Sequence, residues 1–481
     1  MPTRNTPGVY VEEVSTLPPS VAEVATAIPA FIGTTQKGAA GKVEIVQCST
    51  LLEYELRFGG AAPTAFTTDP AGNVTSAKAM PERLMWYALN LYFKNGGGRC
   101  YVVSVGNYDA PLAKERFSAG LAALEREDEP TLIVMPEIVA LAQADFDALC
   151  QQSLFHCKKQ GDRFAILDVK VDADKPDVSA SRDGYGSENL SYGAAYHPYL
   201  TTALTHVYDE TKVTVGGTTT GGTTTGGTTT GGTTTGGTAS TGGTASTGGG
   251  TTTGGTTTTG GTTKTLDTLR STDTGLYNQI KKNLSEQRVD MPPSAAIAGI
   301  YARVDRERGV WKAPANVGLL SVLGPTAQIT NDEQEKLNVE PKTGKSINAI
   351  RAFSGRGTLV WGARTLAGND NEWRYVSVRR LFLMVEESVK AATSFAVFEA
   401  NDVTTWLKVK GMVESYLYGL WEQGALQGEK PEAAYYVHVG LGRTMTPQDV
   451  LEGRMIVEIG LAAVRPAEFI LLRFSHKMAE A

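Results

Sequence analysis

The sequence predicts a multidomain protein of mixed α/β and α+β class, and three observations carry this prediction. The chain has 481 residues, of which 41% are hydrophobic, and single hydrophobic cores stop growing near roughly 250–300 residues. Short apolar strands alternate with helices between residues 100 and 169, which is typical of a parallel sheet covered by helices. The last third combines a long amphipathic helix with strands outside that alternation, so we expect about two or three domains.

The first predicted strand lies in TPGVYVEEV, where Val9 and Val11 alternate with Tyr10 and Glu12 after a Pro-Gly turn. LPPS follows directly, so this strand has no hairpin partner next to it in the sequence. It pairs either with a distant strand of its own domain or with the sheet of a neighbouring molecule, as edge strands can. The residues alone leave both alternatives open.

An α/β alternation follows this first strand. A buried strand is expected in AIPAFIGTT, and helical spacing followed by three glycines predicts a helix in MPERLMWYALNLYFKNGGG. The pattern then predicts strands at 100–105, 131–138 and 162–169, separated by helices at 111–127 and 144–161. From about Lys170 to Asp290 the chain becomes polar and irregular.

The C-terminal third returns to dense apolar patterning. We expect strand-rich segments at 359–366 and 373–381, and a long helix that Asn401 or Asp402 caps and Gly424 ends. The predicted buried face of that helix consists of Val403, Trp406, Val409, Val413, Tyr416, Leu417 and Leu420. Further strands are expected at 434–439, 454–464 and 467–474, with a short helix at 446–453.

Residues 216–263 form a Thr/Gly repeat with a period near five. That period conflicts with the alternation of a strand, and the repeat contains no Leu, Ile, Val or aromatic side chain that could be buried. A meander of TTT units joined by Gly-Gly turns would be marginal for the same reason. We interpret the repeat as a flexible insertion in an outward loop, with glycan attachment or adhesion as the alternative.

Composition and charge exclude several function classes. The net charge of −6 argues against a general binder of nucleic acid, which needs a basic face. No stretch approaches the roughly 20 apolar residues of a membrane span. The first residues lack the apolar core of a signal peptide, and four cysteines without a CxxC pair indicate reduced thiols. We therefore expect assembly in the cytoplasm and no direct membrane insertion.

The motifs of common enzymes and cofactor sites do not occur in this sequence. There is no phosphate-binding loop, no dinucleotide fingerprint, no HExxH and no GxSxG. Cys150, His156 and Cys157 on one predicted helix could ligate a metal, but core packing is the simpler interpretation. Glu137 and Asp168 follow predicted strands, where α/β enzymes place active sites; solvated loop residues are the simpler interpretation. We expect no catalytic residue, no cofactor and no metal.

Arginine is concentrated in one segment of the C-terminal third. This set has no lysine within it and consists of Arg351, Arg356, Arg364, Arg374, Arg379 and Arg380. Arginine suits bidentate pairing with carboxylates at protein interfaces as well as phosphate binding. Because the protein is acidic, we predict that these arginines serve protein–protein interfaces.

Several long blocks resemble one family, the contractile tail sheath proteins of phages and extracellular contractile injection systems. The blocks are PGVYVEEV, AIPAFIGTT, GDRFAILDV, PPSAAIAGIYARVDRERGVWKAPAN, INAIRAFSGRGTLVWGARTL, WRYVSVRRL, FAVFEANDVTTWLKVKGMVESYLYGLWEQGALQG and IVEIGLAAVRPAEFILLRF. They cover both ends and most of the middle, and leave about residues 170–290 unmatched. The resemblance is specific because the blocks are long.

This resemblance implies a structural subunit that polymerises helically around an inner tube and contracts to drive the tube through a target envelope. Its expected partners are further copies in stacked sixfold rings, the inner tube protein, the baseplate, and tail-terminator or cap proteins, with no nucleic acid. It further implies a particle released by lysis. The N-terminal arm and the last strand would then pair between subunits, through Val9, Tyr10, Val11, Glu12, Phe469, Ile470, Leu471 and Leu472. Lys408, Lys410 and Glu414 would contact the tube.

The same resemblance gives an expected division of the chain. In order, it comprises an N-terminal arm (1–22), the first part of an outer α/β domain (23–170), a variable surface insertion with the repeat (171–290), the completion of the outer domain (291–360), a core domain that faces the tube (361–464) and a C-terminal strand and tail (465–481). Two other functions remain as alternatives: an α/β-domain enzyme that uses Glu137 and Asp168, and a surface adhesin that acts through the Thr/Gly tract.

Overall fold

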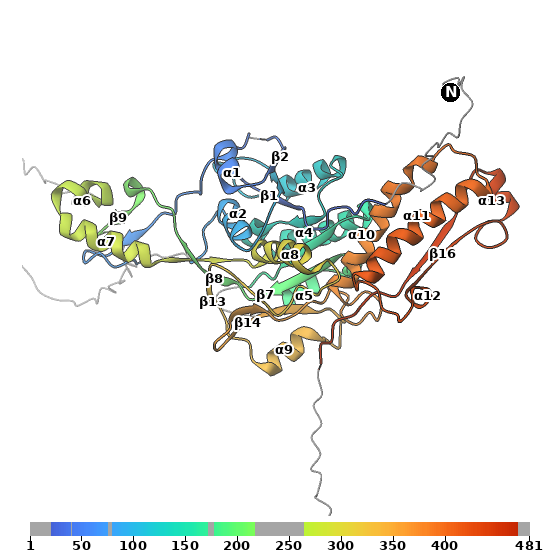
Figure 1. Cartoon of the computed structure of the whole chain (residues 1–481). Coiled ribbons are helices and arrows are strands. Elements are labelled where there is room, and N and C mark those ends of the chain that lie inside the picture. Colours follow the sequence, from blue (N-terminus) through green and yellow to red (C-terminus); the bar gives the residue numbers. More distant parts are fainter. Residues whose placement is uncertain (1–20, 40, 76–78, 172–177, 217–263, 470–481) are drawn as a thin grey trace, which may run out of the picture. The chain divides into compact units, whose positions relative to one another are not determined.

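A computed structural model describes residues 21–39, 41–75, 79–171, 178–216 and 264–469 of the chain (Figure 1). Contacts between residues divide the chain into two compact units. The larger unit comprises the described residues of 1–62, 79–205 and 288–481, and the smaller unit those of 63–78 and 206–287. The smaller unit is therefore built from two separate segments of the chain.

A nine-stranded sheet forms the centre of the larger unit, in the order β12-β15-β14-β7-β6-β5-β1-β4-β2. The strands from β14 to β4 in this order are parallel to their neighbours, while β2, β15 and β12 are antiparallel additions at the edges. Their bounds are β1 Pro29–Gly33, β2 Glu44–Cys48, β4 Cys100–Ser104, β5 Leu132–Val134, β6 Phe164–Asp168, β7 Gly193–His197, β12 Val317–Gly318, β14 Ile347–Phe353 and β15 Gly357–Val360. The predicted parallel sheet is confirmed.

Helices cover this sheet and complete its core. They are α1 Leu51–Phe58, α2 Met85–Lys94, α3 Lys114–Ala123, α4 Gln143–Gln160, α5 Ser179–Gly184, α8 Ser294–Arg308 and α9 Asn331–Asn338. The helices expected at 111–127 and 144–161 are confirmed as α3 and α4. Every residue of β1, β4, β6 and β7 is buried, as expected for parallel strands with both faces covered. A second, antiparallel sheet joins β11 Arg288–Met291, β8 Leu200–Thr205 and β13 Val322–Pro325.

Strand β7 lies inside the stretch 171–290 that the sequence indicates as a variable insertion. It pairs with β6 on one side and β14 on the other, so it is a central strand of the main sheet. Its sequence, GAAYH, carries no β-branched residue, so it gives little strand signal. The small side chains are needed there, because a Cβ on Gly193 would lie 2.5 Å from Leu154 on α4. Within the stretch 171–290, the residues of the smaller unit begin only at His206.

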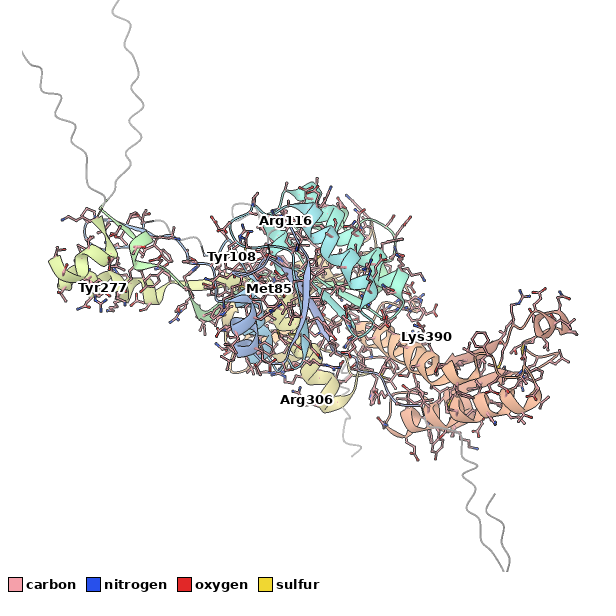
Figure 2. The ribbon with its side chains drawn as sticks, turned by 90° about the horizontal axis from the view of Figure 1, so that it is seen from above. Met85, Tyr108, Arg116, Tyr277, Arg306 and Lys390 are labelled. Atoms are coloured by element: carbon pink, nitrogen blue, oxygen red, sulfur yellow. The ribbon has the colours of Figure 1, made fainter. Side chains whose placement is uncertain are left out.

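The smaller unit packs two helices against a small three-stranded sheet. Its elements are β3 Thr67–Thr68, β9 Thr214–Val215, β10 Lys264–Thr265, α6 Leu266–Thr272 and α7 Thr274–Glu286. Tyr277 of α7, labelled in Figure 2, lies in its apolar core with Phe66 and Ile280. Asp273 caps α7 by accepting a hydrogen bond from the Leu276 amide at 3.0 Å. Helix α7 therefore begins at a side-chain cap directly after α6.

The repeat begins and ends at two paired strands of the smaller unit. In the antiparallel pair β9–β10, Lys264 lies opposite Val215 and Thr265 opposite Thr214. Residues 217–263 themselves lie outside the described residues. The two ends of this segment are thus held side by side, as in a hairpin loop.

The C-terminal lobe, defined here as residues 376–464, is built from two long helices and a two-stranded sheet. Its elements are α10 Val376–Thr393, α11 Val403–Glu422, α12 Pro431–Ala434, β16 Tyr435–Val439, α13 Pro447–Leu451 and β17 Val457–Leu461. Helix α11, both strands and the short helix α13 are confirmed predictions. Asp402 caps α11 through the Thr405 amide at 2.9 Å. Within the predicted buried face of α11, Val403 is 60% exposed and Tyr416 is partly buried, while the other five residues are buried.

The strand expected at 373–381 is wrong, since residues from Val376 onward form α10. The β-branched residues Val376 and Val378 gave the strand signal. The following LFLMVEESVKAAT continues as a helix whose buried residues include Leu381, Leu383 and Met384. A window of nine residues was too short to distinguish the two periods.

Candidate assembly interface

The sheet of the C-terminal lobe is small and largely unburied in the described part of the chain. Strands β16 and β17 are antiparallel, and among the described residues they pair with each other alone. Of their ten residues only Val437 is buried. An isolated two-stranded sheet is marginally stable, and its outer edges present unpaired backbone groups. Both edges are therefore candidate sites for further strands.

An apolar groove of about 740 Å³ accompanies β17. It is bounded by the C-terminal end of α10, the turn at 396–401, and Met455, Val457 and Ile459 at the start and along one face of β17. These three side chains are partly exposed and pack against the core of the lobe. Alternate side chains of a strand added beside β17 would point into this groove, because successive residues of a strand face opposite sides.

The last described residues return from β17 to the sheet domain, where Glu468 is held by several donors. Arg364 donates to its carboxylate from Nε at 3.0 Å and from Nη2 at 2.5 Å. Tyr375 Oη donates at 3.3 Å, and Asn338 Nδ2 at 3.4 Å. Phe469, the next residue, is 74% exposed.

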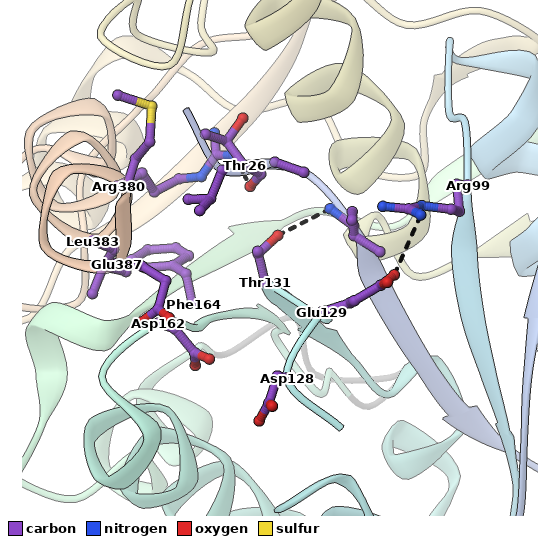
Figure 3. Close-up of a pocket in the computed structure, with 14 residues that line it drawn as sticks. Thr26, Arg99, Asp128, Glu129, Thr131, Asp162, Phe164, Arg380, Leu383 and Glu387 are labelled. Atoms are coloured by element: carbon purple, nitrogen blue, oxygen red, sulfur yellow. Dashed lines mark hydrogen bonds and ion pairs between the residues drawn. The ribbon is translucent and has the colours of Figure 1, made fainter. Parts of the chain in front are cut away.

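The first described residues run past α10 to the main sheet. Val24 donates its amide to Ser388 Oγ at 3.1 Å, and the Ile28 amide donates to Thr131 Oγ1 at 2.9 Å. Between them, the Thr26 carbonyl accepts from Arg380 at 2.8 Å. Figure 3 shows the cavity of about 280 Å³ beside this segment, into which Asp162 and Glu387 also face.

The predicted interface arginines make contacts inside the chain. Arg379 lies between the rings of Tyr192 and Trp373, with its guanidinium carbon 4.2 and 4.5 Å from their centroids. Arg364 and Arg380 form the contacts just described. The other three are more exposed: Arg351 donates to Asn331 and Gln334, Arg356 donates to Asn316, and Arg374 donates to Asp370 and Asn371. Their use between molecules stays a prediction.

The residues predicted to face the tube lie on the outer side of α11. Lys408 is exposed, and Lys410 pairs with Glu414 one turn later at 3.5 Å. A Cβ added to Gly411 would meet nothing within 4 Å. Intrahelical pairs of this kind contribute only about 0.3–0.5 kcal/mol, so they leave these charges available to a partner. Their contact with a tube stays a prediction.

Glu137, an alternative catalytic residue, caps a helix instead of facing solvent. Its carboxylate accepts from the amides of Thr34 at 2.7 Å, Leu84 at 2.9 Å and Met85 at 3.4 Å, so it closes the N-terminus of α2. A Cβ on Gly33 would lie 2.9 Å from this carboxylate, which explains the glycine at the end of β1. Burial raises the pKa of Glu137, and these hydrogen bonds oppose the rise.

Asp168 has the same role at α8. It accepts from the Ser294 amide at 2.8 Å and from Ser294 Oγ at 2.5 Å, and it is 3% exposed. Burial raises its pKa to about 7. The interpretation of Glu137 and Asp168 as solvated loop residues is therefore wrong. Open α/β sheets bind ligands at the carboxyl ends of their strands, but here two of those ends are filled by carboxylates of the protein itself.

The candidate metal ligands belong to the core of the larger unit. Cys150 and Cys157 have no exposed surface, and His156 Nε2 lies 3.0 Å from Arg163 Nη1. Within the described residues, no group of three or more His, Cys, Asp or Glu side chains could hold a metal ion. In that same part of the chain, the helices are too short or too polar to cross a membrane.

Both predicted inter-subunit strands fall largely outside the described residues. This applies to Val9, Tyr10, Val11 and Glu12 at one end and to Ile470, Leu471 and Leu472 at the other. Glu468 and Phe469 are described and do not form a strand. The turn between α10 and α11 was not predicted from the sequence; there Phe398 is fully exposed, with a backbone φ of +68°. The signal available for it was FAVF, an apolar run beside a helix cap.

This combination of an α/β sheet domain and a C-terminal lobe matches solved structures of contractile sheath proteins. The chain matches the model of the phage tail sheath protein central domain over residues 112–366 and that of the phage tail sheath C-terminal domain over 368–477. It belongs to the phage tail sheath family. The match to the central domain alone covers more than half of the chain.

Solved structures support the same assignment along the whole chain. The chain is 30% identical to the sheath protein of an extracellular contractile injection system, the PVC sheath complex in its contracted state, with a TM-score of 0.63 and coverage of 99% of both chains. It is equally similar to the helical sheath of the anti-feeding prophage in its contracted state, with 30% identity, a TM-score of 0.63, and coverage of 99% of this chain and 100% of that one.

Curated relatives match over shorter regions. The tail sheath protein of Vibrio phage KVP40 is 23% identical over 38% of this chain, and that of Enterobacteria phage T4 is 26% identical over 27%. The aligned regions span 26% and 19% of those two relatives, respectively. This chain therefore spans about a quarter or less of their length.

Proposed function

We propose that this chain is the structural subunit of a contractile sheath, which polymerises helically around an inner tube and contracts to drive that tube through a target envelope. The observation that carries the proposal is the C-terminal sheet, in which one residue of ten is buried. A sheet that is incomplete in one chain is expected of a subunit that polymerises by sharing strands.

The terminal segments are the strands that complete this sheet in neighbouring copies. In the N-terminal segment, Val9 and Val11 give an apolar side that suits the groove beside β17, while Tyr10 and Glu12 face away. Phe469 and residues 470–472 supply the second strand. A contact of this kind is heterologous, and when its rotation does not close it generates a helical polymer.

Contraction is then a change between two packings of rigid subunits that remain linked through shared strands. The energy is stored in the assembled sheath, so the subunit needs no nucleotide and no catalytic residue. The capped positions of Glu137 and Asp168 support a subunit without enzymatic activity.

The proposed partners follow from this role. They are further copies in sixfold rings, an inner tube in contact with α11 through Lys408, Lys410 and Glu414, a baseplate, and a terminator or cap. One solved relative belongs to a baseplate of the anti-feeding prophage described as 6-fold symmetrised. We place the subunit in a phage tail or tail-like particle, assembled in the cytoplasm and released by lysis.

The expected division of the chain carries over to this proposal with one adjustment. Residues 1–22 and 465–481 are the linking segments, 361–464 faces the tube, and 23–170 with 291–360 forms the outer domain. Within 171–290, β7 and β8 belong to the larger unit, so the variable part is the smaller unit with its repeat.

Electron microscopy of the expressed full chain tests the proposal. We expect tubes or stacked rings in the presence of the tube protein from the same gene cluster. Deletion of residues 1–20 should give unassembled subunits with an unchanged melting temperature. A full chain that stays monomeric at high concentration beside its tube protein would contradict the proposal.

A further inference from the structure

The arginine-rich segment connects to the terminal segments of the chain. Arg364 and Arg380 stand at either side of the start of α10, where the sheet domain passes into the C-terminal lobe. Arg364 holds Glu468, directly before the last described residue. Arg380 holds Thr26, a few residues after the first described one. The same short stretch of chain thus contacts both terminal segments close to the first and the last described residue.

The contact between Arg364 and Glu468 gives the buried Arg364 guanidinium an opposite charge. Arg364 is 3% exposed, and its other acceptors are the Asn338 and Gly368 carbonyls at 3.4 and 3.5 Å. These long contacts do not neutralise a guanidinium, whereas Glu468 accepts from two of its nitrogens. Such fork-like pairs fix orientation as well as distance. The carboxylate of the terminal segment is therefore the counter-charge for which Arg364 is placed.

The N-terminal contact is built differently but has the same effect. Arg380 pairs with Asp305 of α8 at 3.0 and 2.5 Å, and it lies over the ring of Tyr301 at 4.5 Å. Thr26 joins this buried pair twice: its carbonyl accepts from Arg380 at 2.8 Å, and its hydroxyl donates to Asp305 at 2.6 Å. Hydrogen bonds to charged groups are stronger than those between neutral groups.

Neither terminal segment has regular secondary structure at its contact point. Segments without ladder hydrogen bonds open at low free energy unless other contacts hold them. Here the holding contacts are charge-assisted and partly buried, in contrast to the exposed Arg465 only three residues before Glu468.

We propose that Arg364 with Glu468 and Arg380 with Thr26 are anchors that fix the exit points of the two linking segments, so that force on these segments is passed to the rigid body of the subunit. This inference rests on the proposed function, in which the segments pair with neighbouring copies. Arg364 and Arg380 are accordingly positioning residues for assembly and contraction.

The test replaces Glu468 in the full chain. Glu468→Gln keeps the shape but removes the counter-charge of Arg364. The control, Glu335→Gln, removes an exposed charge of α9 that lies outside both linking segments. We expect Glu468→Gln to raise the concentration needed for polymerisation about tenfold, the equivalent of one lost charge-assisted bond, and Glu335→Gln to leave it unchanged. Melting temperatures should stay within a few degrees for both.

A local measurement accompanies the assembly assay. A spin label on Phe469→Cys reports the mobility of the segment, because the four native cysteines are buried. We expect a restricted label in the parent chain and in Glu335→Gln, and a mobile one in Glu468→Gln. A mobile label with normal polymerisation, or a restricted label with impaired polymerisation, would overturn the anchor.

The N-terminal anchor gives a second pair of variants should Glu468→Gln unfold the chain. Thr26→Val removes the hydroxyl donor to Asp305, while Thr26→Ser retains it. Only Thr26→Val should impair polymerisation, and equal behaviour of the two would overturn this anchor.

Deletion of 470–481 separates the two proposals. If the deletion abolishes polymerisation while Glu468→Gln does not affect it, the anchor is wrong and the linking role stands. If the deletion leaves polymerisation intact, the linking role fails, and the anchor proposal fails with it.

Discussion

Strands β1, β4, β6 and β7 of the main sheet and strands β16 and β17 of the C-terminal lobe are each five residues long, yet their burial differs. Every residue of the four central strands is buried, whereas one of the ten residues of β16 and β17 is. Among the described residues, the main sheet extends over nine strands, whereas β16 and β17 pair with each other alone. The difference separates the part that holds the subunit together from the part that joins subunits.

The two regions also differ in how their side chains are satisfied: buried carboxylates of the main sheet have hydrogen-bond donors, whereas large apolar side chains of the C-terminal lobe are exposed. In the main sheet, Glu137 and Asp168 are buried and their oxygens accept from helix amides. In the C-terminal lobe, Phe398 and Leu451 are 103% and 82% exposed. Large exposed apolar side chains gathered on one lobe mark a surface that a partner covers.

The largest expected contrast comes from removing the same side chain in each region. Ile133→Ala in β5 empties a site that is 1% exposed, so the free energy of unfolding should fall by about 2–5 kcal/mol. Ile459→Ala in β17 removes a partly exposed side chain, and the loss in the free subunit should be about 1 kcal/mol. Chemical denaturation of both variants measures this difference.

For polymerisation we expect the opposite order: Ile459→Ala should have a larger effect than Ile133→Ala. Ile459→Ala should weaken polymerisation, because its side chain lines the groove that receives a neighbouring strand. Equal losses of subunit stability in the two variants, or normal polymerisation of Ile459→Ala, would argue that the C-terminal sheet is complete in one chain.

Glu137→Gln tests whether the carboxylates of the main sheet are structural. The amide nitrogen of glutamine cannot accept from the amides of α2, so a buried donor loses its partner and stability should fall by about 1–3 kcal/mol. Glu335→Gln on the exposed side of α9 is the control and should change little. Unchanged stability in Glu137→Gln would reopen the enzyme interpretation.

Asp168 should make stability depend on pH. Because burial raises its pKa to about 7 in the folded chain, the folded state retains a proton that the unfolded state has lost above about pH 4. The contribution of this group is therefore present at low pH and lost as the pH rises through about 7, with a slope of up to about 1.4 kcal/mol per pH unit. Asp168→Asn, which keeps both contacts with Ser294, should flatten this slope in melting curves from pH 4 to 8.

Phe398→Gly should stabilise the free subunit. The left-handed backbone at this position costs a bulky residue about 1 kcal/mol, which glycine avoids, and the exposed ring has no contact to lose. Ala396→Gly, in the same turn, is the control and should not stabilise. A loss of stability in Phe398→Gly would show that the ring packs within its own chain.

The smallest effect is expected from replacing residues 217–263 by an Asn-Gly turn. Strands β9 and β10 already hold both ends in register, and a shorter connection lowers the entropy of closure. Stability and polymerisation should therefore be retained. Loss of attachment to a target cell, with polymerisation intact, would instead favour the adhesin role of the tract.

Local sequence patterns predicted many helices and strands of this fold, but few of the packing contacts between them. The alternation from 100 to 169 predicted β4, β5, β6 and their helices, because each element carries its own period. Strand β7 gave no signal, since its small residues are required by the packing of Leu154 rather than by strand propensity. Helix α10 was misread because valines at its start favour strands.

Less of the candidate site could be predicted from the sequence. The clustering of arginines was apparent from composition, but the pairing of Arg364 with Glu468 joins residues 104 positions apart. No local period encodes such a contact. The caps formed by Glu137 and Asp168 were missed for the same reason, because their donors lie 53 and 126 residues away.

A cryo-EM reconstruction of the assembled sheath at a resolution that separates strands tests the central claim most directly. The account predicts that the sheet containing β16 and β17 gains strands from the terminal segments of other copies, with side chains of one added strand in the groove beside Val457 and Ile459. A reconstruction in which β16 and β17 remain a two-stranded sheet, with neighbouring copies joined elsewhere, would contradict it.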